Sequence, residues 1–121
     1  MADLRALAVA LLVSVMLAPE AFAHAFLDSA TPAVGSAVHG APVQVELHFS
    51  EGLEPAFSTV RVDDAKGKRV DAGDVHVDPS DASILEVSLG KLAPGRYHVT
   101  WRVVSIDTHV TEGAFTFDVL P

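Results

Sequence analysis

The chain has 121 residues and a formal charge of −8 at pH 7, from 16 acidic and 8 basic side chains. Such an acidic surface repels nucleic acid and anionic lipid, so neither is an expected partner. Cysteine is absent, which excludes a disulfide framework, thiolate metal ligands and the blue-copper site, because each of them requires that residue.

The first 23 residues have the pattern of a cleaved export signal. Arg5 precedes the apolar run 6–18, and Ala21-Phe22-Ala23 is the small-x-small site that signal peptidase accepts. The alternative is an uncleaved membrane anchor, but the run is shorter than the roughly 20 residues that span a bilayer. We therefore predict cleavage after Ala23. The mature chain would be one domain, residues 24–121, and its charge would be −7 because the leader carries −1.

Short segments with alternating apolar and polar side chains follow one another along the mature chain. The alternation is clearest in residues 43–49, where Val43, Val45, Leu47 and Phe49 share a face, and in residues 84–89 and 97–104. Weaker candidates are residues 24–28, 59–63, 69–71, 75–78 and 113–120. About seven short strands between Gly, Pro and Asp turns predict an all-β fold, an antiparallel β-sandwich with Greek-key connections. A small closed barrel is the alternative.

A carboxylate and an imidazole, Asp107 and His109, lie two residues apart between two of the predicted strands. Residues i and i+2 of an extended backbone project from the same face, so these side chains can converge on one point. One oxygen and one nitrogen form half of a tetragonal metal site. The alternative for this triplet is a polar turn without a ligand.

His24 becomes the first residue if the leader is removed after Ala23. Its free α-amino group and the Nδ1 atom of its imidazole can then chelate a single metal ion. Together with His109 and Asp107, they offer three nitrogens and one oxygen, a donor set that Cu(II) favours. The alternative is that His24 is only a frayed terminus.

The remaining histidines are expected to be solvated surface residues, since they lie on the polar phase of strands or in polar loops: His39, His48, His76 and His98. Catalytic patterns are weak. Ser105 with His109, or Ser50 with Glu51, lacks a third group that would orient the pair. We therefore predict that the protein is not an enzyme.

Several motifs in order resemble the CopC family of periplasmic copper-binding proteins from residue 24 to residue 119. They are His24-Ala25-Phe26-Leu27, Thr31-Pro32-Ala33-x-Gly35-Ser36, Phe49-Ser50-Glu51, Leu92-x-Pro94-Gly95-x-Tyr97, Trp101-Arg102-Val103-Val104-Ser105, and Asp107-x-His109 followed by Gly113 and Phe117. The resemblance implies a seven-stranded cupredoxin-like, or more broadly immunoglobulin-like, β-sandwich in the periplasm. It also implies a role in copper resistance or uptake, often beside a CopD-type membrane transporter.

The same resemblance implies which residues hold the metal. His24, through its amine and imidazole, would bind one Cu(II) per mature chain together with Asp107 and His109, and Glu51 would support the site or act as a weak ligand. The chain departs from the family pattern at Thr108, where many relatives have glycine between the Asp and the His. It also lacks a Met-rich loop, since Met1 and Met16 are both in the leader. No Cu(I) site is therefore expected, because Cu(I) prefers soft sulfur donors.

The sequence as a whole predicts a monomeric exported protein that carries or buffers copper. Two alternatives belong to other classes of function. One is a copper-dependent oxidative enzyme with an amino-terminal histidine chelate, and the other is an interaction sandwich without a metal.

Overall fold

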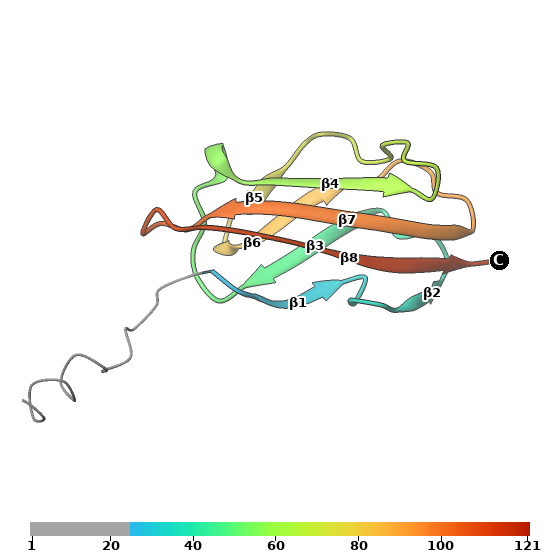
Figure 1. The fold of residues 1–121 in the computed structure, drawn as a ribbon, viewed down its shortest axis with the longest axis horizontal. Helices are drawn as coiled ribbons and strands as arrows, with labels where there is room; N and C mark the ends of the chain where they lie inside the picture. The colour runs from blue at the N-terminus through green and yellow to red at the C-terminus, as the bar shows by residue number, and fades with distance from the viewer. Residues whose placement is uncertain (1–24) are drawn as a thin grey trace, which may run out of the picture.

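A computed structural model describes residues 25–121, and these residues form two four-stranded sheets that pack face to face (Figure 1). The strands are β1 (Leu27–Thr31), β2 (Ala37–His39), β3 (Gln44–Phe49), β4 (Thr59–Asp64), β5 (His76–Asp78), β6 (Asp81–Ser88), β7 (Gly95–Val104) and β8 (Val110–Leu120), with a 3-10 helix, η1 (Pro55–Phe57), before β4. One sheet has the order β1-β3-β6-β5 and the other β2-β8-β7-β4. The predicted export signal and His24 lie outside the described residues.

The core lies between the sheets and consists of the apolar positions of the alternating strands. Val45, Leu47 and Phe49 of β3 are buried, while Glu46 and His48 between them are only partly covered. Aromatic rings join the layers: Phe49 meets Trp101 edge to face, with ring centroids 5.1 Å apart. Because each strand has an apolar and a polar face, each sheet buries its apolar face against the other sheet. This packing holds the two sheets together without a disulfide. No helix in residues 25–121 is long and apolar enough to cross a membrane.

The all-β sandwich is confirmed, but the described chain has eight strands rather than seven. The candidate strand at residues 69–71 forms only isolated bridges, Arg69 with Asp63 and Asp71 with Leu89. The unpredicted strand is β2, which pairs with β8 in parallel, an exception to the antiparallel pattern. Its three residues are too few to show an alternation. The two sheets are separate, so the closed barrel is wrong.

The strand ends also differ from the predicted ones. Val43 was assigned to the buried face of its strand, yet it precedes β3 and is 78% exposed. Strand β8 begins at Val110, three residues before its predicted start. Pairing explains this, because the residues from Val110 onward continue the ladder with β7, as in the Val104–Val110 pair.

One end of the sandwich gathers segments that are far apart in the sequence. The β7–β8 loop, η1, the end of β3 and the start of β1 all lie at this end (Figure 1). Strand pairing accounts for the arrangement, because Leu27 is paired with Phe49 and Leu53 with Ser105. The residues around Asp107 are therefore neighbours of the amino-terminal segment.

Candidate metal centre

The loop between β7 and β8, residues 105–109, is closed by its own backbone. Ser105 N–H donates to the carbonyl of His109 at 2.9 Å, and Thr108 N–H donates to the carbonyl of Ser105 at 2.8 Å. Ile106 N–H donates to Gly52 at 3.1 Å, which attaches the loop to the segment after β3. These bonds leave the side chains of Asp107 and His109 at the outer end of the sandwich.

Asp107 and His109 point toward each other. The Nδ1 atom of His109 lies 3.1 Å from Oδ2 of Asp107, and both side chains are partly exposed. The sequence predicted that these side chains would converge, but for a different reason, since it assumed an extended backbone. They meet across a tight turn instead, because Thr108 between them has a positive φ of 72°.

Ser105 holds the carboxylate of Asp107 from the buried side. Its side chain is fully buried, and its hydroxyl donates to Oδ1 of Asp107 and lies 3.3 Å from the carbonyl of His109. The hydrogen bond from Ser105, with smaller contributions from His109, lowers the pKa of Asp107 below its ordinary value. Asp107 is therefore kept in the charged form that a metal ion requires.

The amino-terminal segment reaches the same end of the sandwich. Ala25 is buried, and its carbonyl accepts a hydrogen bond from Oγ1 of Thr111 at 2.8 Å. Phe26 exchanges two bonds with Ser50: its N–H donates to Oγ of Ser50, and Ser50 N–H donates to the carbonyl of Phe26, both at 2.8 Å. His24 itself lies outside the described residues, so its predicted role as a ligand stays a prediction.

Glu51 lies in the sequence between Ser50, which is hydrogen-bonded to the amino-terminal segment, and Gly52, which accepts a hydrogen bond from the β7–β8 loop. Its Oε2 atom is buried and makes no hydrogen bond within residues 25–121. A buried carboxylate oxygen without a donor or cation is unfavourable by about 1–3 kcal/mol or more. Glu51, which the resemblance to CopC predicts to lie near the site, is therefore a carboxylate with unused binding capacity.

The four other histidines are on the surface or partly covered, as predicted, but two of them pair with acids. His76 Nε2 lies 3.0 Å from Oε2 of Glu86, and His48 Nε2 lies 3.7 Å from Oε1 of Glu46. None of the four meets Asp107 or His109 in an ion pair within the described residues.

An acidic cluster that the sequence did not reveal lies on the outer face of the β1-β3-β6-β5 sheet. One oxygen each from Glu46, Asp78 and Glu86 lies within 4.8 Å of the others. The pairing register of β3 with β6 brings these acids together, because it places Glu46 directly opposite Glu86. Such an oxygen-only group suits Ca²⁺ or Mg²⁺ better than copper, and exposed acidic groups often carry no ion.

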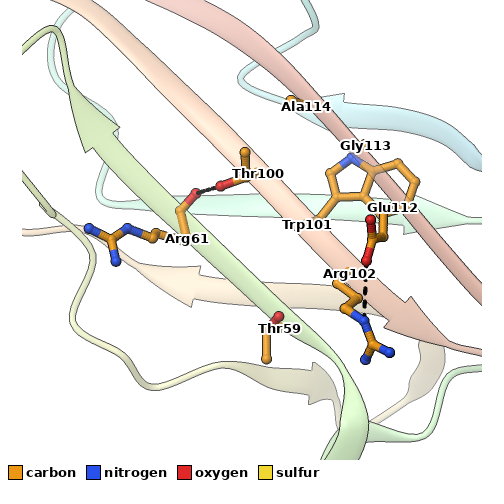
Figure 2. A pocket seen from close by; sticks show the side chains of 8 residues that line it. All are labelled: Thr59, Arg61, Thr100, Trp101, Arg102, Glu112, Gly113 and Ala114. Carbon is orange, nitrogen blue, oxygen red and sulfur yellow. Dashed lines mark hydrogen bonds and ion pairs between the residues drawn. The ribbon is translucent and has the colours of Figure 1, made fainter. Parts of the chain in front are cut away.

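A shallow hollow lies on the outer face of the β2-β8-β7-β4 sheet (Figure 2), and neither Asp107 nor His109 lines it. Eight residues line it: Thr59, Arg61, Thr100, Trp101, Arg102, Glu112, Gly113 and Ala114. Its charges are paired, as Arg102 and Glu112 lie 3.2 Å apart, and Arg61 pairs with Asp63 at 2.8 Å. No imidazole lines the hollow, so Asp107 and His109 form the stronger candidate for a metal site.

Comparison with known proteins decides the family. The model of the CopC domain matches residues 27–120. The chain belongs to the CopC family. It is 37% identical to Protein YobA of Escherichia coli K12 over 113 residues, which cover 93% of this chain and 91% of YobA.

Solved structures of CopC-family proteins have the same fold. The crystal structure of CopC from Methylosinus trichosporium OB3b has a TM-score of 0.76 at 36% identity, over 81% of this chain and 95% of that chain. PcoC, a methionine-rich copper resistance protein from Escherichia coli, has a TM-score of 0.71 at 36% identity, over 80% and 99%. The cupredoxin-like sandwich expected from the CopC motifs is thereby confirmed.

Proposed function

We propose that this CopC-family protein holds one Cu(II) ion at the end of the sandwich where Asp107 and His109 meet. The observation that carries the proposal is the 3.1 Å approach of the His109 imidazole to the Asp107 carboxylate, beside an anchored amino-terminal segment. We further propose that the protein is exported to the periplasm, is monomeric, and carries or buffers copper in resistance or uptake.

The donor set explains the choice of metal ion. His109 offers an imidazole nitrogen and Asp107 a carboxylate oxygen, and His24 would add its amine and imidazole nitrogens once the leader is cleaved. Borderline nitrogen donors with one oxygen favour Cu(II), which also heads the affinity order of the divalent first-row ions. The name of PcoC describes a methionine-rich protein, but this chain has no methionine after Met16.

The position of Ala25 supports the part proposed for His24. Successive Cα atoms of a trans peptide are about 3.8 Å apart, so the residue before Ala25 starts close to the place where Ala25 is fixed. The carbonyl of Ala25 is hydrogen-bonded to Thr111, which follows His109 by two residues. Glu51, with its buried and unbonded oxygen, would balance the charge of the ion from behind the ligands or bind it weakly.

A Cu(II) titration of protein that begins at His24, followed by EPR, tests the proposal. We expect one nitrogen-rich type-2 signal per chain and no intense thiolate band. His109→Ala should weaken binding more than Asp107→Ala, because water replaces a carboxylate oxygen more readily than an imidazole. Binding should weaken as the pH falls, since protons compete for the ligands. Two or more tight sites, or wild-type affinity in both variants, would refute the site.

The amine of His24 can be tested separately from its side chain. One glycine added before His24 turns the amine into an amide, whose lone pair is delocalised into the peptide bond. Fold and melting temperature should be unchanged, and Cu(II) affinity should fall by orders of magnitude. Equal affinity of the two proteins in competition with one chelator would leave His24 as a side-chain ligand at most.

We propose no catalysis, and a CopD-type transporter as the partner that exchanges copper with the protein. Copper-dependent consumption of peroxide with oxidised glycan products would instead support the oxidative enzyme. The absence of any tight copper binding would support an interaction sandwich without a metal.

A further inference from the structure

Two hydroxyl groups that are not proposed ligands hold the amino-terminal segment. Terminal residues of a domain usually fray unless something ties them down. Here Thr111 Oγ1 donates to the carbonyl of Ala25 at 2.8 Å, and Ser50 Oγ accepts from Phe26 N–H at 2.8 Å. Thr111 is in β8 and Ser50 follows β3, so the two contacts come from opposite sheets of the sandwich.

We propose that Ser50 and Thr111 are positioning residues for the copper site. Their hydroxyl groups fix Ala25 and Phe26, so the proposed ligand His24, which precedes them in the sequence, would be held at the end of the sandwich that carries Asp107 and His109. This inference rests on the proposed function, because it assigns a task to residues that support the proposed amino-terminal ligand.

The placement of the two hydroxyls matches this task. Thr111 is two residues beyond His109 in the sequence. Ser50 directly precedes Glu51 and Gly52, and the carbonyl of Gly52 accepts a hydrogen bond from Ile106 of the β7–β8 loop. Each hydroxyl therefore joins the amino-terminal segment to a segment that carries another group of the site. If only a fraction of the molecules has the terminus in place, the apparent affinity falls by that fraction.

The backbone can keep the segment folded without these hydroxyls. Ser50 N–H also donates to the carbonyl of Phe26 at 2.8 Å, and Leu27 is paired with Phe49 in the sheet. Removing a hydroxyl should thus loosen the terminus without unfolding the sandwich. Ala25 also contributes its buried methyl group to the core.

The experiment compares variants with and without the hydroxyl in protein that begins at His24. Ser50→Ala and Thr111→Val should each weaken Cu(II) binding about threefold to tenfold, the effect of one ordinary hydrogen bond. Ser50→Thr and Thr111→Ser keep the hydroxyl and should restore the affinity. Thr116→Val is the matched control, because Thr116 is on the opposite face of β8. Melting of the copper-free proteins checks that all variants fold.

The glycine extension before His24 separates positioning from a general structural role. Once the amine is lost, Ser50→Ala and Thr111→Val should have little further effect on Cu(II) affinity. An undiminished effect in the extended protein, or a failure of the hydroxyl-retaining variants to restore binding, would overturn the inference.

The same binding measurements, made on Asp107→Ala and His109→Ala, test the proposed function separately. If Asp107→Ala and His109→Ala weaken binding but the hydroxyl variants bind like wild type, only the positioning inference fails. If Asp107→Ala and His109→Ala also bind like wild type, the copper site itself fails and the positioning inference with it.

Discussion

At the scale of single residues, Thr108 has the least usual backbone of the candidate site. Its φ of 72° lies in the left-handed region, which β-branched residues rarely adopt because Cβ approaches the carbonyl oxygen. Many relatives were expected to have glycine here, and the structure keeps the glycine-like conformation with threonine in place. The positive φ turns the chain so that Asp107 and His109 meet.

We predict that Thr108→Gly stabilises the copper-free protein by about 1 kcal/mol, since glycine adopts a positive φ without a penalty. Part of the gain is offset because glycine also increases the entropy of the unfolded chain. Denaturant unfolding measures the change. Thr108→Ala is the control, because alanine keeps a Cβ and should gain less. A glycine variant less stable than the alanine variant would contradict the assignment of strain to this residue.

At the scale of structural elements, the pairing of β7 with β8 depends on a glycine. Gly113 is directly opposite Trp101, and a Cβ added at Gly113 would lie 2.7 Å from Cε2 of the indole. Figure 2 shows the indole of Trp101 lying beside Gly113. The indole cannot simply move away, because it packs edge to face against Phe49.

Gly113→Ala should therefore destabilise the fold by about 1–3 kcal/mol, the usual range for overpacking. It should also shift the fluorescence of Trp101, which is the only tryptophan of the chain. Gly52→Ala is the matched control, since a Cβ there would be 3.7 Å from Ile106, an ordinary contact. Equal stability of the two variants would show that Trp101 yields easily.

The short strand β5 is tied to β6 by a contact that depends on pH. Nδ1 of His76 lies 2.7 Å from the carbonyl of Asp74, and Nε2 lies 3.0 Å from Glu86. Both partners are acceptors, so the doubly protonated ring fits best. The backbone carbonyl of Asp74 first, and then Glu86, raise the pKa of His76 above its ordinary value of 6.5.

A raised pKa means that the contribution of His76 to stability is complete below pH 6.5 and is lost as the pH rises through the folded-state pKa. We predict that His76→Gln lowers the unfolding midpoint more at pH 5.5 than at pH 8.5. A double-mutant cycle with Glu86→Gln measures the coupling of the pair. A coupling that is constant or larger at high pH would show that the contact does not involve the charged imidazole.

At the scale of the whole molecule, the composition of the chain leads to a prediction about the oxidation state of the proposed copper ion. No cysteine is present, and both methionines precede residue 24. We predict that the protein beginning at His24 binds Cu(I) far more weakly than Cu(II), because soft sulfur donors are missing. Competition against a Cu(I) chelator measures this. Tight retention of Cu(I) would point to a site formed by the other histidines.

The charge of the whole molecule is compatible with this role. The formal charge of −8 attracts cations and opposes association with nucleic acid or anionic lipid. Within residues 25–121 the arginines nevertheless lie beside acids, as in the Arg96–Asp118 pair at 2.8 Å.

The sequence by itself determined the class of fold, because a period of two in residues such as Val45, Leu47 and Phe49 requires two faces of different polarity. It also identified Asp107 and His109 as a pair, since a two-residue spacing limits how far apart they can lie. The motifs from residue 24 to 119 indicated the family without a structure. The short strand β2 was missed, because three residues show no period.

Only the tertiary structure decided what surrounds that pair. Ser50, Ser105 and Thr111 are ordinary polar residues in the sequence, and their hydrogen bonds to Phe26, Asp107 and Ala25 appear only when these segments meet at one end of the sandwich. The positive φ of Thr108 depends on hydrogen bonds closed by Ser105, not on the preference of threonine itself. Local patterns specify which face a side chain takes, but contacts between distant residues, such as Thr111 and Ala25, which are 86 positions apart, determine which side chains become neighbours.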